Sequence, residues 1–274
     1  MQTMHLFAGI GGGLLADRIL GHDPIIAVEW DRYACQVLRE RAADGWFPNL
    51  QVWDGDVRLF DPSEYAGKVD CIHAGFPCQD ISVAGNQAGV GEETRSGLYR
   101  EVLRIAGVVQ PRYLFLENVA AIVSNGLGTV LNNLAALGYD SEWLCLRASD
   151  CGAAHHRDRW WLLAYSTQLQ RDGGNDNAGI SMEEFKVSES GNCCRDENVA
   201  YADSTRCEGY RNSAKRRKEK HSESGISNWW EIESAVGRVV NGVPNRFLRL
   251  KGLGNAQVPL QAAVAFKLLM DRHA

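Results

Sequence analysis

Residues 5–13 read His5-Leu6-Phe7-Ala8-Gly9-Ile10-Gly11-Gly12-Gly13, an apolar strand end that passes through a glycine turn into the start of a helix. Glycine lets the backbone adopt positive φ and approach a ligand closely, and a helix start offers free N–H groups. Such a loop is a weak signal on its own, because tight packing without a ligand also explains it. The rest of the chain has to distinguish these two interpretations.

The sequence on either side of this loop alternates strand and helix patterns through residue 164. Short apolar runs predict strands at 3–7, 25–29, 51–54, 69–74, 113–117, 139–146 and 160–165. Longer runs predict helices at 14–20, 33–41, 99–109, 128–137 and 256–272. Alternation of this kind predicts an α/β fold with a doubly wound, mostly parallel sheet. In the last helix Leu260, Val264, Leu268 and Leu269 are spaced to pack back on the sheet.

Composition changes near Tyr165, where the chain becomes rich in Gly, Ser, Asn, Asp and charged residues up to residue 228. We therefore expect two domains: residues 1–164 with 254–274, and a small domain, 165–253, inserted before the final helix. The net charge of −5 does not suggest a nucleic-acid binder. A basic run, Lys215-Arg216-Arg217-Lys218, nevertheless lies in the inserted part. An isolated run of this kind usually lies in a solvated loop, and the alternative is a surface that contacts phosphate.

Several classes of protein are disfavoured by what the chain lacks. It has no apolar run of about 18 residues, so no membrane span is expected, and its first residues lack signal-peptide features, so a cytoplasmic protein is expected. The eight cysteines form no CxxC pair and are expected to be mostly free thiols. Cys193, Cys194, Cys207 and His221 fit no common zinc spacing, so no metal is expected.

Polar and aromatic residues follow the second and third predicted strands. Glu29 ends the second strand about 20 residues after the glycine loop, where an acid binds ribose hydroxyls in dinucleotide folds. Trp30 could stack on a flat ligand, and Asp56 could accept from an adenine amino group. The loop lacks GxGxxG spacing, and no basic residue is placed to bind a pyrophosphate. An adenosine cofactor without phosphate fits better, which favours S-adenosylmethionine.

A cysteine and a carboxylate follow two other strands. The run Gly75-Phe76-Pro77-Cys78-Gln79 comes directly after the fourth strand, and Glu117-Asn118-Val119 comes directly after the apolar residues 113–116 of the fifth. A lone cysteine is more often structural than reactive, and an acid often begins a helix. Carboxyl ends of parallel strands share one sheet edge, however, so Cys78 and Glu117 are predicted to converge on one substrate.

Taken together, these residues resemble the cytosine-C5 DNA methyltransferase family of bacterial and phage restriction–modification enzymes. The likeness covers nearly all of the chain outside about 165–245. FAGIGG is similar to the family's cofactor loop, GFPCQ to its nucleophile loop and Glu117-Asn118-Val119 to its ENV motif. His156-Arg157-Asp158-Arg159 is similar to its RxR strand, and Gly254-Asn255-Ala256-Gln257-Val258 to its closing element. His155-His156 depart from the pattern before the first arginine, which puts one DNA contact in doubt.

The resemblance implies a Rossmann-like methyltransferase sheet with a small target-recognition domain. It implies Cys78 as the nucleophile at cytosine C6, Glu117 at N3, Arg159 at O2, and Arg157 on the base or a phosphate. The residues expected to bind S-adenosylmethionine, whose product is S-adenosylhomocysteine, are Phe7, Ala8, Gly9, Gly11, Gly12, Glu29, Trp30, Asp56, Val57, Pro77, Leu98, Asn255 and Val258. Those expected to contact DNA are Gln79, Ser82, Lys215, Arg216, Arg217 and Lys218. The expected partner is double-stranded DNA with a flipped cytosine, the expected state a monomer, and a cognate restriction endonuclease would act separately.

Three alternatives stay open at this point. An RNA cytosine methyltransferase of the same fold is disfavoured moderately by Gln79 after the Pro-Cys pair. A catalytically silent DNA-binding homologue is disfavoured because Cys78, Glu117 and both arginines are present. A nicotinamide-dependent oxidoreductase fits poorly, since the phosphate-binding glycine pattern is absent.

Overall fold

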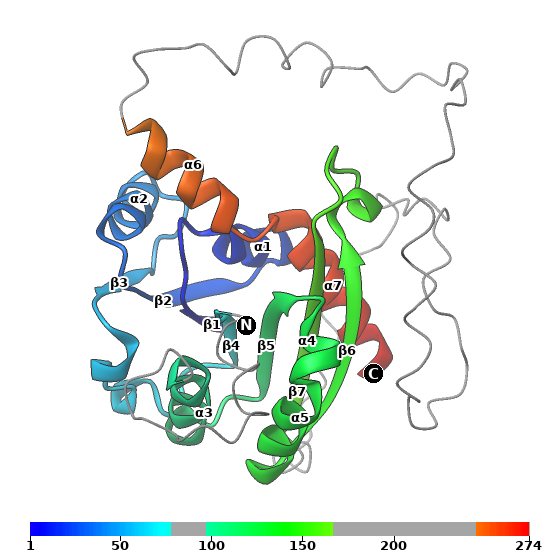
Figure 1. Cartoon of the computed structure of the whole chain (residues 1–274). Helices are drawn as coiled ribbons and strands as arrows, with labels where there is room; N and C mark the ends of the chain where they lie inside the picture. The colour runs from blue at the N-terminus through cyan, green and yellow to red at the C-terminus, as the bar shows by residue number, and fades with distance from the viewer. Residues whose placement is uncertain (78–96, 167–244, 274) are drawn as a thin grey trace, which may run out of the picture. The chain divides into compact units, whose positions relative to one another are not determined.

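A computed structural model describes residues 1–77, 97–166 and 245–273, and these contain a seven-stranded sheet in the order β3-β2-β1-β4-β5-β7-β6 (Figure 1). The strands are β1 (Gln2–Leu6), β2 (Asp23–Glu29), β3 (Gln51–Asp54), β4 (Cys71–Gly75), β5 (Tyr113–Val119), β6 (Tyr139–Arg147) and β7 (Asp158–Ser166). β3, β2, β1, β4 and β5 are parallel, whereas β7 runs antiparallel to both β5 and β6. The predicted α/β class and mostly parallel sheet are confirmed.

Helices cover both faces of the sheet (Figure 1). The helices are α1 (Gly12–Leu20), α2 (Arg32–Ala43), α3 (Gly97–Val109), α4 (Ile122–Asn125), α5 (Leu127–Ala136), α6 (Arg246–Asn255) and α7 (Pro259–His273), with 3₁₀ turns at Val57–Leu59, Ser63–Tyr65 and Ala148–Cys151. α3 and α5 pack on one face, and α1, α2 and α7 on the other. Such two-sided cover explains why the strands read as nearly continuous apolar runs.

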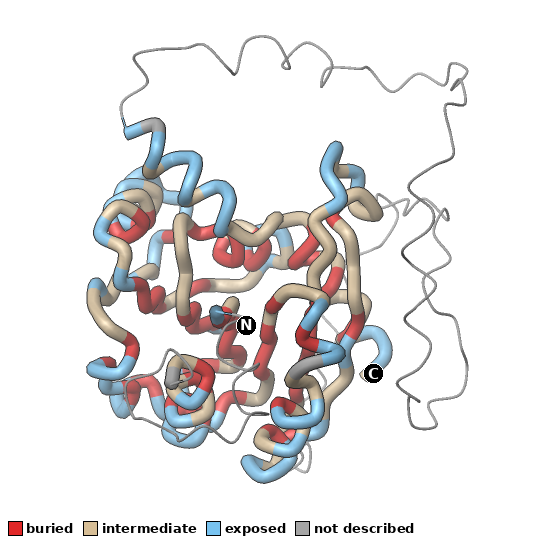
Figure 2. The backbone as a smooth tube through the Cα atoms, viewed as in Figure 1, coloured by how far each residue is buried: buried red, intermediate tan, exposed pale blue. Residues whose placement is uncertain are grey.

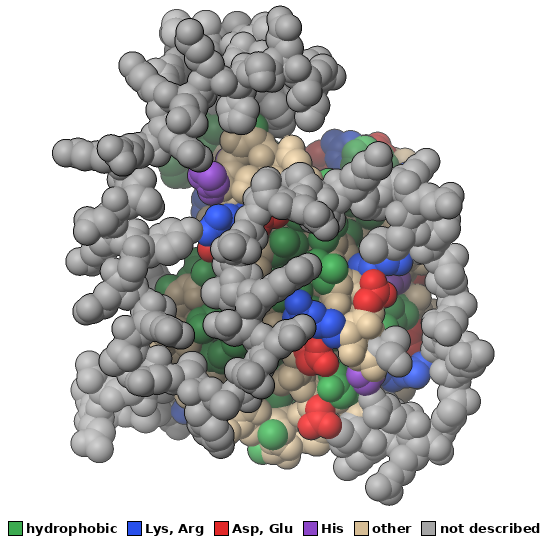
Figure 3. Space-filling view, turned by 90° about the vertical axis from the view of Figure 1, so that its right-hand side faces the viewer, with side chains coloured by type: hydrophobic (Ala, Val, Ile, Leu, Met, Phe, Trp, Pro, Cys, Tyr) green, Lys and Arg blue, Asp and Glu red, His purple; other side chains and the backbone are tan. Residues whose placement is uncertain are grey.

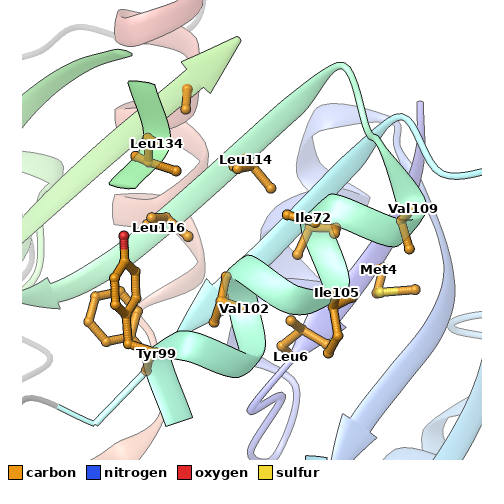
Figure 4. Packing of buried hydrophobic residues seen from close by; sticks show 14 of the residues in the cluster. Met4, Leu6, Ile72, Tyr99, Val102, Ile105, Val109, Leu114, Leu116 and Leu134 are labelled. Atoms are coloured by element: carbon orange, nitrogen blue, oxygen red, sulfur yellow. The ribbon is translucent and has the colours of Figure 1, made fainter. Parts of the chain in front are cut away.

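The core under α3 follows from strand alternation. Met4, Leu6, Ile72 and Leu114 point to the same face, because side chains two residues apart on a strand share a face. Figure 4 shows these side chains meeting those of α3, such as Ile105, and Figure 2 shows buried residues concentrated along the strands. Each fully buried aliphatic side chain stabilises the fold by about 1.5–3 kcal/mol.

The opposite face of the central strands is unexpectedly polar. His5 pairs with His73 and His73 with Phe115 in the strand register, so their rings form a row with neighbouring centroids 4.8 Å apart. Asp17 of α1 meets this row, with its Oδ2 2.6 Å from His5 Nε2. That separation is typical of a hydrogen bond. Two ligand atoms of a tetrahedral metal ion would lie roughly 3.3 Å apart, so the His5–Asp17 pair has the spacing of a hydrogen bond and not of metal ligands.

Ionisation within this buried row is strongly biased. Burial of His73 lowers the pKa of its ring to about 3, so the ring is neutral at physiological pH. The pKa of Asp17 is held well below its ordinary value by His5 and His22, although burial opposes this. A neutral imidazole and an ionised carboxylate therefore lie side by side beneath the glycine loop.

Two features of the C-terminal region differ from the sequence expectation. α6 was not predicted, and Gly254 and Asn255 end this helix instead of only preceding the last one. α7 does pack on the sheet, but its buried side includes Ala262, Ala265, Phe266 and Leu269. Of the four leucine and valine positions expected to pack, Leu269 alone is fully buried, because small alanines allow the closest approach. Across the described ranges no helix combines the length and apolarity required to span a bilayer.

Candidate active site

The glycine loop has the backbone geometry of a tight ligand cradle. Phe7, Gly9 and Gly11 all have positive φ, at 58°, 53° and 94°. Gly12 has no room for a side chain, since a Cβ there would lie 2.3 Å from the backbone oxygen of Gln257. Ala8, half-buried, completes the turn. The loop is thus held between the end of β1 and the chain that links α6 to α7.

Glu29, at the end of β2, anchors this loop through a hydrogen bond. Its carboxylate accepts the backbone N–H of Gly9 at 2.7 Å and those of Trp30 and Asp31 at 2.9 and 2.8 Å. A carboxylate offers about four acceptor positions, so about one stays open for a hydroxyl donor. The Trp30 side chain beside it is 76% exposed, and its ring is available for stacking.

The remaining predicted cofactor residues differ in burial and in their contacts. Asp56 caps the 3₁₀ turn Val57–Leu59, and its carboxylate accepts the side chain of Arg58. Val57 is buried in the core under α3, and Leu98 packs partly against that core. Pro77 is exposed and is the last described residue before the gap.

The C-terminal element closes over the loop. Lys251 of α6 donates to Asp31 at 2.7 Å, and Gly252 abuts Ile10, where a Cβ would lie 2.9 Å from the Ile10 side chain. Asn255 is exposed and Val258 half-buried. The result is a pocket lined by His5, Leu6, Phe7, Ala8, Gly9, Gly13, His73, Gly75, Asn255, Ala256 and Gln257.

Glu117 lies on β5, at the edge of the sheet where Gly75 ends the neighbouring strand β4. It is paired with Gly75 in the parallel β4–β5 ladder, and its Oε1 lies 2.8 Å from Arg159 Nε on β7. Burial raises the pKa of the Glu117 carboxyl above its ordinary value, against the opposing charges of Arg159 and Arg157. Asn118, buried beside it, donates to the carbonyl of Phe76 at 3.1 Å and so ties β5 to the segment that leads to Cys78.

The side chain of Arg157 points to the α6–α7 link, whereas that of Arg159 points to Glu117. The Arg157 guanidinium donates to the carbonyls of Gly254 and Ala256, and its own carbonyl accepts from Gln261. Its φ of 31° is in the left-handed region, which turns the chain into β7. Arg157 thus fastens the start of β7 to the α6–α7 link, whereas Arg159 meets the carboxyl.

Several predicted residues lie outside the described ranges, namely Cys78, Gln79, Ser82, Lys215, Arg216, Arg217 and Lys218. On the face shown in Figure 3, described basic and acidic side chains are interspersed and form no patch of one sign. A further hollow, at the opposite sheet edge between Gln2, Gln51 and Asp70, contains none of the predicted residues. Sequence reasoning gave no role to Gln257, His73 or Lys251, whose positions only the fold reveals.

The fold brings a glycine cradle, a carboxylate suited to a diol, and a partly buried carboxyl–guanidinium pair to one edge of the sheet in an α/β domain. A family model described as C-5 cytosine-specific DNA methylase matches residues 1–243. The chain belongs to the C-5 cytosine-specific DNA methylase family.

Individual relatives are consistent with this membership. The chain is 33% identical over 215 residues to the Type II methyltransferase M.CviJI of Paramecium bursaria Chlorella virus IL3A, covering 76% of this chain and 55% of the relative. It is 31% identical over 173 residues to the Type II methyltransferase M.HhaI of Haemophilus parahaemolyticus, covering 62% and 50%. The chain thus spans about half the length of these curated relatives.

Among solved structures, one described as a DNA modification methyltransferase encoded within a prophage (E. coli) is similar, with a TM-score of 0.49 and 27% identity. The match covers 62% of this chain and 48% of that one.

Proposed function

We propose that the chain is a DNA cytosine-C5 methyltransferase that acts on a cytosine flipped out of duplex DNA. The observation that carries the proposal is Glu117, a partly buried carboxyl held 2.8 Å from Arg159 and paired in register with Gly75, the first residue of the Gly75–Cys78 run. Family membership gives the reaction class, and relatives such as M.HhaI bear the name Type II methyltransferase.

The residues present fit S-adenosylmethionine. Glu29 keeps about one acceptor position for a ribose hydroxyl, Trp30 offers an exposed ring for the adenine, and Gly9, with open space beside it, leaves room for close approach. Phe7, Ala8, Asp56, Val57, Pro77, Leu98, Asn255 and Val258 complete the proposed set. When bound, this cofactor supplies a methyl group activated by its sulfonium.

Cys78 is the proposed nucleophile. Cytosine C5 is too electron-poor to attack unaided, and a thiolate that adds to C6 saturates the 5,6 bond and makes C5 nucleophilic. The thiolate is the reactive form. After C5 is methylated, loss of its proton and elimination of the thiolate restore the aromatic ring and free Cys78.

Glu117 and Arg159 stabilise the ring during that addition. A protonated Glu117 donates to N3, where negative charge develops, and its raised pKa favours the protonated form. Arg159, at 2.8 Å, orients the carboxyl and in the proposal binds cytosine O2. Arg157 holds the α6–α7 link beside them, from which it can also serve the base or a neighbouring phosphate.

The proposed partner is double-stranded DNA, contacted by Gln79, Ser82 and the run 215–218. The proposal includes a small target-recognition domain at 165–253, next to a catalytic domain of 1–164 and 254–274. It further includes action as a monomer in the cytoplasm, with any cognate restriction endonuclease acting separately.

The test is transfer of labelled methyl from S-adenosylmethionine to duplex DNA, with tRNA as the competing substrate. We expect label in DNA only, complete loss in Cys78→Ser with cofactor binding retained, and a trapped covalent adduct on DNA that carries 5-fluorocytosine. Label in tRNA would identify an RNA enzyme instead. Transfer to neither, or methylation by Cys78→Ser, would overturn the proposal.

A further inference from the structure

Gln257, between α6 and α7, reaches the candidate active site from above the sheet. Glu117, Gly75 and His73 share one face of β4 and β5, because Gly75 and His73 are two residues apart and Gly75 is in register with Glu117. Gly75 has no side chain, and Gln257 occupies the space this leaves. A Cβ on Gly75 would lie 2.9 Å from Gln257 Nε2 and 3.0 Å from Glu117 Oε2. The amide nitrogen and the carboxyl oxygen thus both lie over Gly75, where burial raises the pKa of Glu117 and the Gln257 side chain lowers it in part.

The other end of the same amide faces the buried histidine row. A Cβ on Gly13 would lie 2.7 Å from Gln257 Oε1, 2.9 Å from His73 Cε1 and 3.2 Å from His5 Nδ1. The His73 ring lies beside the Gln257 oxygen, and Asp17 hydrogen-bonds His5 in turn. The amide oxygen is thus directed at the histidine row and its nitrogen at the Glu117 carboxyl.

We propose that Gln257 is a positioning residue whose amide N–H holds the Glu117 carboxyl in place for the substrate, and whose own orientation is fixed by His73. The catalytic part of this inference rests on the proposed function, whereas the contact itself does not. Because the Gln257 backbone also presses on Gly12, the same residue joins the carboxyl to the cofactor loop.

The charges around Glu117 set the direction of the effect. Arg159 contacts Glu117 from β7, Arg157 acts on it through its charge from just before that strand, Gln257 faces it from the α6–α7 link, and the neutral His73 ring lies behind the amide. Cys78, which follows Gly75, lies outside the described residues. An amide N–H stabilises the carboxylate form, so its removal raises the pKa of Glu117 further above its ordinary value.

The experiment measures that pKa directly by infrared titration, identifying the Glu117 carboxyl band by its absence in Glu117→Gln. In Gln257→Met, which has nearly the same shape and no donor, we expect the pKa to rise by about one to two pH units. We also expect kcat to fall by up to about 100-fold with a smaller change in KM, and the alkaline limb of the pH profile to move upward.

Two further variants keep the result interpretable. Gly75→Ala leaves both side chains intact and inserts a methyl between them, so it should move the pKa in the same direction. Gln261→Met removes another buried glutamine amide, which donates to the carbonyls of Leu146 and Arg157. It should lower stability without moving the pKa of Glu117.

The outcomes separate this inference from the proposed function. An unchanged Glu117 pKa in both Gln257→Met and Gly75→Ala overturns the role of Gln257, even if the wild type methylates DNA. An equal shift in Gln261→Met overturns it too, since any buried amide would then suffice. A shift confined to the first two variants, in a protein that methylates no DNA, supports the contact and removes the proposed function.

Discussion

Glu29 accepts the backbone N–H of Gly9 at 2.7 Å, so the end of the second strand holds the turn that follows the first. The same carboxylate also accepts the N–H groups of Trp30 and Asp31. The residue thus has two tasks in the proposed enzyme, since it shapes the loop and offers its remaining acceptor position to a ribose.

Glu29→Gln should weaken cofactor binding. A glutamine amide has one acceptor oxygen, so at least one loop N–H loses its partner and the ribose loses an anionic acceptor. We expect the Kd for S-adenosylhomocysteine, measured by calorimetry, to rise about 10- to 100-fold. Glu40→Gln, on the exposed surface of α2, is the matched control. An equal Kd in the wild type and Glu29→Gln would contradict the assignment.

Gly12→Ala and Gly107→Ala should have opposite effects on stability. The first places a Cβ 2.3 Å from the Gln257 oxygen, so the loop or the α6–α7 link must move, at a cost of about 1–3 kcal/mol. The second lies in α3 with its nearest neighbour 4.0 Å away, and alanine should raise the free energy of unfolding by about 0.5–1 kcal/mol. Urea denaturation measures both, and a stable Gly12→Ala would mean that the link does not press on the loop.

His73 should make the protein less stable in mild acid. Unfolded histidine binds a proton near pH 6.5, whereas burial lowers the pKa of His73 to about 3. As the pH falls below 6.5, the unfolded state therefore binds more protons, and the free energy of unfolding decreases by up to about 1.4 kcal/mol per pH unit. The loss from this group reaches about 2 kcal/mol at pH 5.

His73→Gln should remove that slope between pH 6.5 and 5, whatever its effect at neutral pH. The exposed His155 provides the control, since His155→Gln should leave the slope as it is. Parallel pH–stability curves for the wild type and His73→Gln would show that the ring is not kept neutral by the fold.

Neutralising the run 215–218 should change how DNA binding depends on salt. If its four cations each meet a phosphate, replacing them with glutamine lowers the slope of log K against log salt by up to about 3.6. Lys68→Gln, exposed at the opposite edge of the sheet, should have no such effect. An unchanged slope would place these cations in a solvated loop, the alternative that their sequence also allows.

The strands were the most predictable part of the molecule. All seven were located from apolar runs, and Gln51–Asp54 was bounded correctly at both ends. Strands covered on both faces are continuously apolar, which makes them conspicuous in a sequence. α6 gave no comparable signal, since Phe247, Leu250 and Leu253 are largely exposed and glycines lie within the helix.

The site was predictable where a residue follows a strand end, and less so where it depends on packing. Glu29 and Glu117 could be assigned to one edge because parallel strands carry their ends there. Gln257 could not, because its proximity to Glu117 depends on an empty position at Gly75 and on how α6 meets α7. The different directions of Arg157 and Arg159, two residues apart, also follow from local backbone geometry that the sequence does not reveal.

The reversed direction of β7 has a consequence for engineering. Arg159, the second residue of this strand, lies beside Glu117, so β7 ends at Ser166 on the far rim, where the Ser166 backbone N–H donates to the carbonyl of Arg112 ahead of β5. The chain is described again at Asn245, from which α6 leads back to Asp31 on the near rim. The two points at which the proposed target-recognition segment could be exchanged therefore lie on opposite rims. A donor segment must span the sheet as well as match the new recognition sequence.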